Sequence, residues 1–233
     1  MGYMKLRVAS YNIRKCVGLD LRRKPDRTLN VIAGLQSDIV VLQEADKRLG
    51  PRPSSIPVQH IEDRTGLRPL PLAANDVSVG WHGNAVLASP DVVVKKVDRL
   101  HLPGFEPRGA GIAEVEIGGQ TIRIVATHLG LMRKHRAQQL HYLRQELEAL
   151  PDLPTVIAGD MNEWSPNAGF EALGTGFTLH SPGRSFHASR PIAGLDRIGH
   201  CGSFSLYDAG VSETPEARRA SDHLPVWADL TLN

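Results

Sequence analysis

The chain of 233 residues is long enough for one large domain or two small ones, and its hydrophobic content of 41% is typical of a globular protein. No apolar stretch approaches the roughly 20 residues that cross a bilayer. The two cysteines, Cys16 and Cys201, are too few for a disulfide framework or a thiolate zinc site. The formal net charge is only +2, but Lys and Arg outnumber Asp and Glu by 17 to 11 in residues 1–110, whereas residues 111–233 carry 10 against 14.

No repeat and no linker rich in Pro, Gly or Ser divides the chain, so we expect a single domain over residues 1–233. The start leads directly into a strand-like run, without the apolar segment and cleavage site of a signal peptide. We therefore expect a cytoplasmic protein. No feature of the sequence predicts a protein partner.

Short apolar runs recur along the whole chain and predict many β-strands. They cover residues 5–11, 38–42, 84–88, 92–97, 111–117, 121–127, 154–158, 204–207 and 225–230. The alternating runs 111–117 and 121–125 flank Gly118-Gly119 and predict a β-hairpin. Residues 84–88 and 92–94, joined through residues 89–91, predict a second hairpin.

Helices are expected to be fewer than strands. Apolar residues at three- and four-residue steps predict helices over residues 25–36 and 133–150, and shorter helices are predicted at 57–66 and 167–173. Many strands with helices at irregular intervals favour an α/β (α+β) fold, with two β-sheets and the helices outside them. The helices are too few for a (β/α)₈ barrel.

Polar side chains follow several of the predicted strands, where a rigid sheet can deliver them to one point. Glu44 comes just after the apolar run 38–42. A carboxylate at the end of a buried strand is costly unless it is paired or binds a metal. We therefore predict that Glu44 is a metal ligand. The alternative is a capping or solvent-facing Glu.

Asp160 and Asn162 lie two residues apart after the run 154–158. In extended backbone this spacing places both side chains on one face. The Asp160 carboxylate could take a proton from water, while the Asn162 amide donates to a phosphate oxygen. An Asx turn, in which Asp160 bonds to its own backbone, is the alternative.

Asp222 and His223 are adjacent and are expected to lie in a turn before the last strand. His223 could bond to a phosphate oxygen, and Asp222 could bind metal or tune an imidazole. Asp196 opens a short strand and could orient His223 as a carboxylate–imidazole pair. His128 ends a strand of the first hairpin, and Asn12 ends the first strand. A purely structural histidine and an Asx turn at Asn12 are the alternatives.

Four carboxylates and two imidazoles that converge would repel one another without a cation, so the pattern predicts a divalent metal and an anionic substrate. Oxygen ligands favour Mg²⁺ or Mn²⁺. A basic segment, residues 14–27, follows Asn12 and suits a phosphate-bearing substrate such as nucleic acid. It could also be an ordinary solvated loop.

Taken together, the motifs and their order resemble the endonuclease/exonuclease/phosphatase superfamily. The resemblance covers nearly the whole chain. Its motifs are Ser10-Tyr11-Asn12, Leu42-Gln43-Glu44, Gly83-Asn84-Ala85-Val86-Leu87, Thr127-His128-Leu129, Gly159-Asp160-Met161-Asn162, Leu195-Asp196-Arg197-Ile198 and Ser221-Asp222-His223-Leu224-Pro225-Val226. The resemblance implies a four-layered sandwich of two packed mixed β-sheets flanked by helices, with the site at one end. It also implies an Mg²⁺- or Mn²⁺-dependent phosphoester hydrolase.

The same resemblance implies roles for individual residues. Glu44 would bind the metal with help from Asn12, and Asp222 would sit beside it. Asp160 would position or deprotonate the attacking water, and Asn162 would hold the phosphate.

The remaining roles concern the phosphate and its leaving group. His223, oriented by Asp196, would stabilise the transition state, and His128 would contact the scissile phosphate or assist the leaving group. The expected substrate contacts are Arg14, Asn84 and Arg108.

Two departures from known subfamilies leave the substrate open. Abasic-site endonucleases carry an active-site Tyr in mid-chain, but no Tyr lies between Asn84 and Thr127. Inositol 5-phosphatases place a Trp before their Asp-Arg-Ile run, where this chain has Gly194-Leu195. We therefore predict a phosphodiesterase or nuclease first. The alternatives are an enzyme acting on a phospholipid or small phosphorylated metabolite, and a non-catalytic binding module of the same fold.

Overall fold

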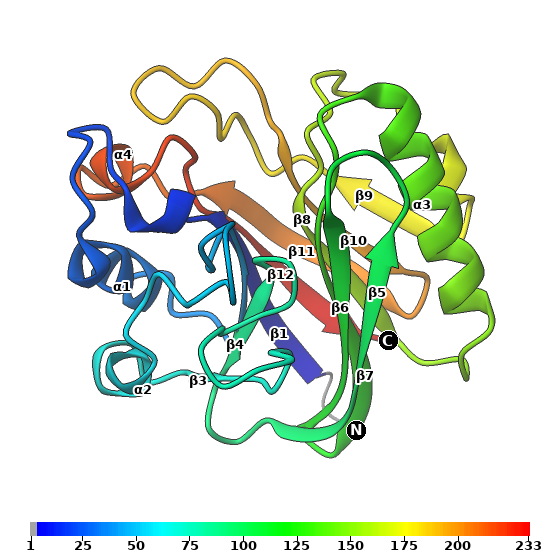
Figure 1. Ribbon diagram of the computed structural model, residues 1–233. Coiled ribbons are helices and arrows are strands. Elements are labelled where there is room, and N and C mark those ends of the chain that lie inside the picture. The colour runs from blue at the N-terminus through cyan, green and yellow to red at the C-terminus, as the bar shows by residue number, and fades with distance from the viewer. Residues whose placement is uncertain (1–3) are drawn as a thin grey trace.

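A computed structural model describes residues 4–233 of the chain. Within this range, twelve strands form two six-stranded mixed sheets that pack face to face, and the helices cover their outer faces (Figure 1). This confirms the predicted four-layered sandwich. None of the helices in the described range is both long and apolar enough to span a membrane.

The first sheet has the strand order β11-β12-β1-β2-β4-β3, in which β1 and β2 are parallel and the other neighbours are antiparallel. Its strands are β1 (Met4–Asn12), β2 (Ile39–Gln43), β3 (Arg68–Pro69), β4 (Ala85–Ala88), β11 (Phe204–Val211) and β12 (Val226–Leu232). Helices α1 (Pro25–Ala33), α2 (Gln59–Thr65) and α4 (Ala217–Ala220) lie on its outer side, together with the short turn η1 (Arg14–Cys16) (Figure 1).

The second sheet has the order β5-β6-β7-β8-β10-β9, and β7 and β8 are its parallel pair. Its strands are β5 (Val93–Leu102), β6 (Arg108–Ile117), β7 (Gln120–His128), β8 (Thr155–Asp160), β9 (Phe177–His180) and β10 (Asp196–Cys201). Helix α3 (Arg133–Glu148) and the short turn η2 (Glu171–Leu173) cover its outer face. Leu140 and Leu143 of α3 pack there against Val125 and Ile157.

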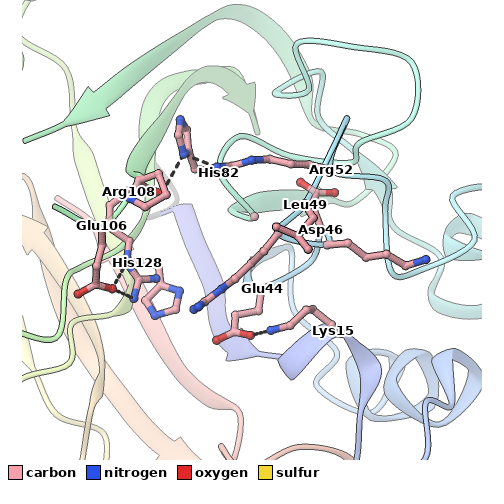
Figure 2. A pocket seen from close by; sticks show the side chains of 13 residues that line it. Lys15, Glu44, Asp46, Leu49, Arg52, His82, Glu106, Arg108 and His128 are labelled. Carbon is pink, nitrogen blue, oxygen red and sulfur yellow. Dashed lines mark hydrogen bonds and ion pairs between the residues drawn. The ribbon is translucent and has the colours of Figure 1, made fainter. Parts of the chain in front are cut away.

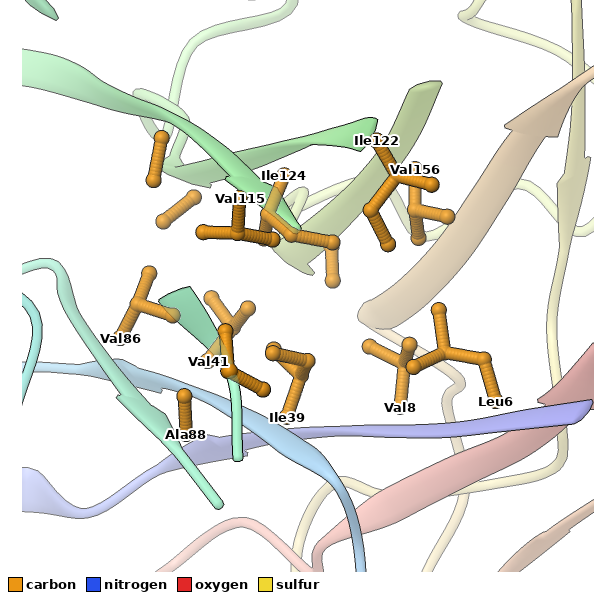
Figure 3. Close-up of a cluster of buried hydrophobic side chains, with 14 of the residues drawn as sticks. Leu6, Val8, Ile39, Val41, Val86, Ala88, Val115, Ile122, Ile124 and Val156 are labelled. Atoms are coloured by element: carbon orange, nitrogen blue, oxygen red, sulfur yellow. The ribbon is translucent and has the colours of Figure 1, made fainter. Parts of the chain in front are cut away.

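The two-residue period of the strands divides their side chains between an inner and an outer apolar layer. In β1, Leu6 and Val8 enter the core between the sheets, whereas Ala9 and Tyr11 pack towards the helices. Figure 3 shows the inner layer, in which Leu6, Val8, Ile39, Val41 and Val86 face Val115, Ile122, Ile124 and Val156. Packing in this layer fixes the position of one sheet relative to the other, and with it the positions of their strand ends.

The hairpin predicted over residues 111–125 is confirmed. Strands β6 and β7 pair along their length, and both turn residues, Gly118 and Gly119, have positive φ angles of 56° and 76°. Two-residue hairpin turns favour this backbone because its twist matches that of the strands.

The second predicted hairpin is wrong. Strand β4 pairs with β2 and β3 in the first sheet, whereas β5 pairs with β6 in the second, so residues 89–92 carry the chain across the sandwich. Val86 and Val92 lie in the same inner core, and burial there outweighs local pairing. The predicted helix at 167–173 is reduced to η2, because Gly169 has a φ angle of 95° that a helix cannot accept. The helices predicted at 25–36, 57–66 and 133–150 are present with shorter bounds.

Candidate active site

Four strands carry polar residues to the same end of the sandwich. Strand β1 ends at Asn12, β7 at His128 and β8 at Asp160, and β10 begins at Asp196. Each residue lies an even number of positions from an inner-core residue of its own strand, as Asp160 does from Ala158. All four side chains therefore point into the space between the sheets, where the apolar core stops.

These side chains form one hydrogen-bonded cluster. Asn12 Nδ2 donates to Asp160 Oδ2 over 3.0 Å, and the Nε2 atoms of His128 and His223 lie 3.3 and 3.6 Å from the same oxygen. His223 Nδ1 donates to Asp196 Oδ2 over 2.8 Å. The predicted convergence of Asn12, His128, Asp160, Asp196 and His223 is thus present in the structure.

His223 is held as a buried imidazolium at neutral pH. Burial alone would lower its pKa, but the surrounding carboxylates of Asp196, Asp160 and Asp222 raise it to about 10. The Ser185 hydroxyl donates to the Asp196 carboxylate and keeps it facing the imidazole. The result is a cationic donor aimed at the Asp160 carboxylate.

His128 has the opposite protonation state. Burial lowers its pKa to about 3; Arg108 and His223 add to this effect, although Asp160 works against it. A neutral imidazole can donate one hydrogen bond but has no extra proton to release at neutral pH. Contact with a phosphate oxygen fits this state better than protonation of a leaving group does.

The turn after β8 is an Asx turn, the alternative considered from the sequence. The Asn162 backbone N–H donates to Asp160 Oδ1 over 2.9 Å, and Asn162 Nδ2 donates to the Leu129 carbonyl over 2.8 Å. The turn fixes one oxygen of Asp160 and leaves Oδ2 directed at Asn12 and the imidazoles. Phosphate binding by Asn162 stays a prediction.

Glu44 and Asp222 lie at the mouth of the cluster, and each faces a cation from η1. The Lys15 ammonium bonds to the Glu44 carboxylate, and Arg14 Nε lies 3.5 Å from Asp222 Oδ2. Burial lowers the pKa of Lys15 to about 8, and repulsion by Arg48 contributes. A site that already attracts a cation to Glu44 suits a bound metal ion.

The residues fit a divalent cation, although they offer two places for it. Within residues 4–233, ligand atoms of Asp160, Asp196 and His223 form the one acidic–imidazole group whose atoms all lie within 4.8 Å of one another. His223 bonds to Asp196, and its imidazolium compensates one of the two carboxylates, so the group keeps one uncompensated negative charge. The Glu44 carboxylate is the second place, and a metal ion there would take over the position that the Lys15 ammonium now occupies.

A pocket of about 270 Å³ opens beside the cluster. Figure 2 shows His128 and the Glu106–Arg108 pair on one side of it, Lys15 and Glu44 opposite, and Arg52 with His82 at the far end. Arg108 Nη2 lies 2.8 Å from Glu106 Oε2. Among the predicted substrate contacts, Arg108 thus lines this pocket, whereas Arg14 lies beside Asp222.

Asn84, the third predicted substrate contact, does not line this pocket, and its contact with a substrate stays a prediction. It is fully buried, and its Nδ2 donates to the carbonyls of Trp81 and Gly109 over 3.2 and 2.9 Å. It therefore ties the start of β4 in one sheet to β6 in the other. Sequence reasoning missed Ser185, which orients Asp196, because no motif marks a serine in that long loop.

The protonation of His223 predicts how the metal-free protein responds to alkaline pH. Its pKa is raised from 6.5 to about 10 on folding, so its stabilisation is complete below pH 6.5 and is lost as pH rises through about 10. Lys15, with its lowered pKa, acts in the opposite sense above pH 8. We therefore expect the stability of wild type minus that of His223→Gln to fall between pH 6.5 and 10, as measured by urea unfolding in EDTA. A difference that stays constant over this range would contradict the assignment.

Comparison with known proteins agrees with this geometry. The model of the "Endonuclease/Exonuclease/phosphatase family" matches residues 9–223. YbhP of Escherichia coli K12, an uncharacterized protein, is 32% identical over 163 residues; the alignment spans 66% of this chain and 64% of the relative. The fold resembles that of an endonuclease/exonuclease/phosphatase family protein from Bacteroides thetaiotaomicron, with a TM-score of 0.80, 18% identity and full coverage of both chains.

A further structure of similar fold is D. rerio TDP2 in complex with a single-strand DNA product. Its TM-score is 0.72 at 19% identity, and the match covers 97% of this chain and 98% of that one. Proteins of the matched family are generally hydrolases of phosphoester bonds and typically depend on divalent metals. Since the family model spans almost the whole sequence, this chain belongs to the endonuclease/exonuclease/phosphatase family.

Proposed function

We propose that this protein is a divalent-metal-dependent phosphodiesterase, with one domain carrying the whole site. The observation that carries the proposal is the convergence of Asn12, His128 and His223 on one oxygen of Asp160. Such an arrangement provides a base for water and donors for the phosphate oxygens at a single point. Phosphodiester hydrolysis needs both.

The bound cation, held by Glu44 with Asn12 and Asp222, would neutralise charge on the phosphate and favour ionisation of water. Asp160 Oδ2 would orient the attacking water and accept its proton. His223, held by Asp196, would donate to the oxygen on which charge develops.

The other contacts act on the phosphate itself. Neutral His128 would donate to a non-bridging oxygen, and Asn162 would hold a second one. Arg14 and Arg108 would also contact the substrate. Each now faces a carboxylate, Asp222 and Glu106 respectively, and would exchange it for the phosphate.

Nucleic acid is the first substrate class that we propose. The basic segment 14–27 begins next to the site, because β1 ends at Asn12. Clustered Lys and Arg attract a phosphate backbone. The similar fold of TDP2, solved with a single-strand DNA product, supports the same class.

A phospholipid headgroup diester is the second candidate, and one observation favours it. Seven large apolar side chains in loops at the catalytic end of the sandwich are exposed: Leu21, Leu49, Phe105, Leu131, Met132, Trp164 and Ile192. Apolar residues among basic ones suit contact with an anionic membrane surface.

Chelation should abolish the activity. We expect hydrolysis of single-stranded oligonucleotides in Mg²⁺ or Mn²⁺, its loss in EDTA, and its recovery when excess metal is added back. The reason is that the carboxylates need a cation to accept an anionic phosphate beside them. Product release from an oligonucleotide and from anionic phospholipid vesicles, measured in parallel, distinguishes the two substrate classes. Undiminished turnover in EDTA would contradict a metal-dependent reaction.

A further inference from the structure

The loop between β2 and α2 supplies three cations to the pocket beside His128. Lys47, Arg48 and Arg52 all line it, and they come from six consecutive positions. The pocket therefore has a basic wall that is separate from the basic segment 14–27.

The carboxylates of the pocket are already engaged elsewhere. Asp46 accepts hydrogen bonds from the backbone N–H groups of Val79 and Gly80 over 2.8 and 3.2 Å. Glu106 bonds to Arg108, and Glu44 bonds to Lys15. In the part of the chain that the structure describes, Lys47, Arg48 and Arg52 consequently form no ion pair. Asp46 acts on Arg52, and Glu106 acts on Arg48, only at longer range.

Arg52 is held in place by a neutral partner. Its Nη1 lies 3.0 Å from His82 Nδ1, which also lies 2.9 Å from the Pro107 carbonyl oxygen. Burial lowers the pKa of His82, and the Arg52 charge adds to this effect. The guanidinium is thus oriented at the far end of the pocket without being neutralised (Figure 2).

Arg48 lies where its charge reaches both sides of the pocket. It contributes to the lowered pKa values of Lys15 on one side and of Arg108 and His128 on the other. Five cations line the pocket against three carboxylates, Glu44, Asp46 and Glu106, so an excess of positive charge remains there and repels itself. A ligand with negative charge would relieve that repulsion and would find donors already converging on it.

We infer that this pocket is a subsite for a second phosphate group of the substrate, with Arg48 as its main contact and Arg52 at its end. The inference rests on the proposed function and adds the requirement that the substrate carry two phosphates. Planar guanidinium groups match phosphate oxygens in pairs. Because His128 borders the pocket and also lies 3.3 Å from Asp160 Oδ2, the second phosphate would be joined to the scissile one by a short linker.

Binding of nucleotide products tests the subsite without requiring turnover. By calorimetry in Mg²⁺, wild-type protein should bind thymidine 3′,5′-bisphosphate about tenfold or more tightly than thymidine 5′-monophosphate, as one charge-assisted contact provides. Arg48→Ala should bring this ratio close to one. Arg64→Ala, which removes another exposed arginine, on α2 and outside the pocket lining, should leave the ratio unchanged.

Two further comparisons identify the source of the second phosphate. A 5′-phosphorylated dithymidylate is compared with dithymidylate for nucleic acid, and inositol 1,4-bisphosphate with inositol 1-phosphate for small metabolites. If the additional phosphate increases affinity through Arg48 in only one of these pairs, that pair identifies the class of substrate. For the dinucleotides, loss of Arg48 should raise KM and change kcat little, since the contact is made equally before and during reaction.

The possible results separate this inference from the proposed function. The subsite would be overturned if wild-type protein preferred the ligand with the additional phosphate by less than twofold in every pair. It would also be overturned if that preference survived Arg48→Ala. A preference that depends on Arg48 without hydrolysis of any diester would support the subsite and contradict the phosphodiesterase activity.

Discussion

Replacing Asp160 by Asn is expected to lower kcat for phosphodiester hydrolysis about 10²- to 10⁴-fold, the range that loss of a general base produces. The substitution preserves shape but removes the charge that orients water. Asp160 is almost fully buried, and its Oδ2 is the atom on which Asn12 and both imidazoles converge. Asp196, the other carboxylate within the cluster, is bonded to His223 and Ser185 and is not free to take its place.

The measurement is turnover of bis(4-nitrophenyl) phosphate in saturating Mg²⁺ or Mn²⁺. Asp152→Asn is the matched control, since Asp152 is exposed in the loop between α3 and β8. Circular dichroism and a urea midpoint establish that the Asp160→Asn protein is folded. If this variant retains more than a tenth of wild-type kcat, Asp160 is not the base.

Replacing Gly159 by Ala is expected to destabilise the fold by about 3 kcal/mol or more, the upper part of the range for overpacked interiors. A Cβ at this position would lie 1.9 Å from the Thr127 carbonyl oxygen. That oxygen is part of β7, which pairs with β8 in the parallel register Thr127↔Gly159. Both are interior strands of the second sheet, so neither can yield without breaking its other pairings.

Urea denaturation measures the change, with Gly176→Ala as the matched control. Gly176 has no heavy atom within 4 Å of the added Cβ and should change stability little. Activity should fall together with stability, because a shifted β8 displaces Asp160 from His128. Equal urea midpoints for the two variants would contradict this expectation, because they would show that β7 and β8 can move apart with little loss of stability.

Much of the sandwich follows from local pattern. The alternation of residues 111–117 and 121–125 around two glycines specifies a hairpin, because a shift of one residue would turn the inner side chains, such as Val115 and Ile124, to the other face. The same period of two explains why residues as distant as Asn12 and Asp160 face each other. Each lies at the inner side of its strand end, which is a property of the sequence alone.

The partners of β4 and β5 could not be predicted in this way. Their runs are close in the chain and look like a hairpin, but each run completes a different sheet. Pairing is decided by which apolar faces meet across the whole sandwich, and that information is spread over distant strands. The surroundings of Asn84 could not be predicted for a related reason: its motif marks the end of the sandwich but does not reveal that both amide hydrogens bind backbone carbonyls.

What the sequence by itself determined is the set of strands, the polar residues at their ends and the face on which each one points. The tertiary structure alone decided which loops surround them. Arg48, Arg52 and His82 meet at one pocket because the β2–α2 loop folds over the strand ends, and no periodicity governs a loop. A side chain's charge state is decided in the same way: His128 and His223 are the same residue type, but burial against different neighbours makes one neutral and the other cationic.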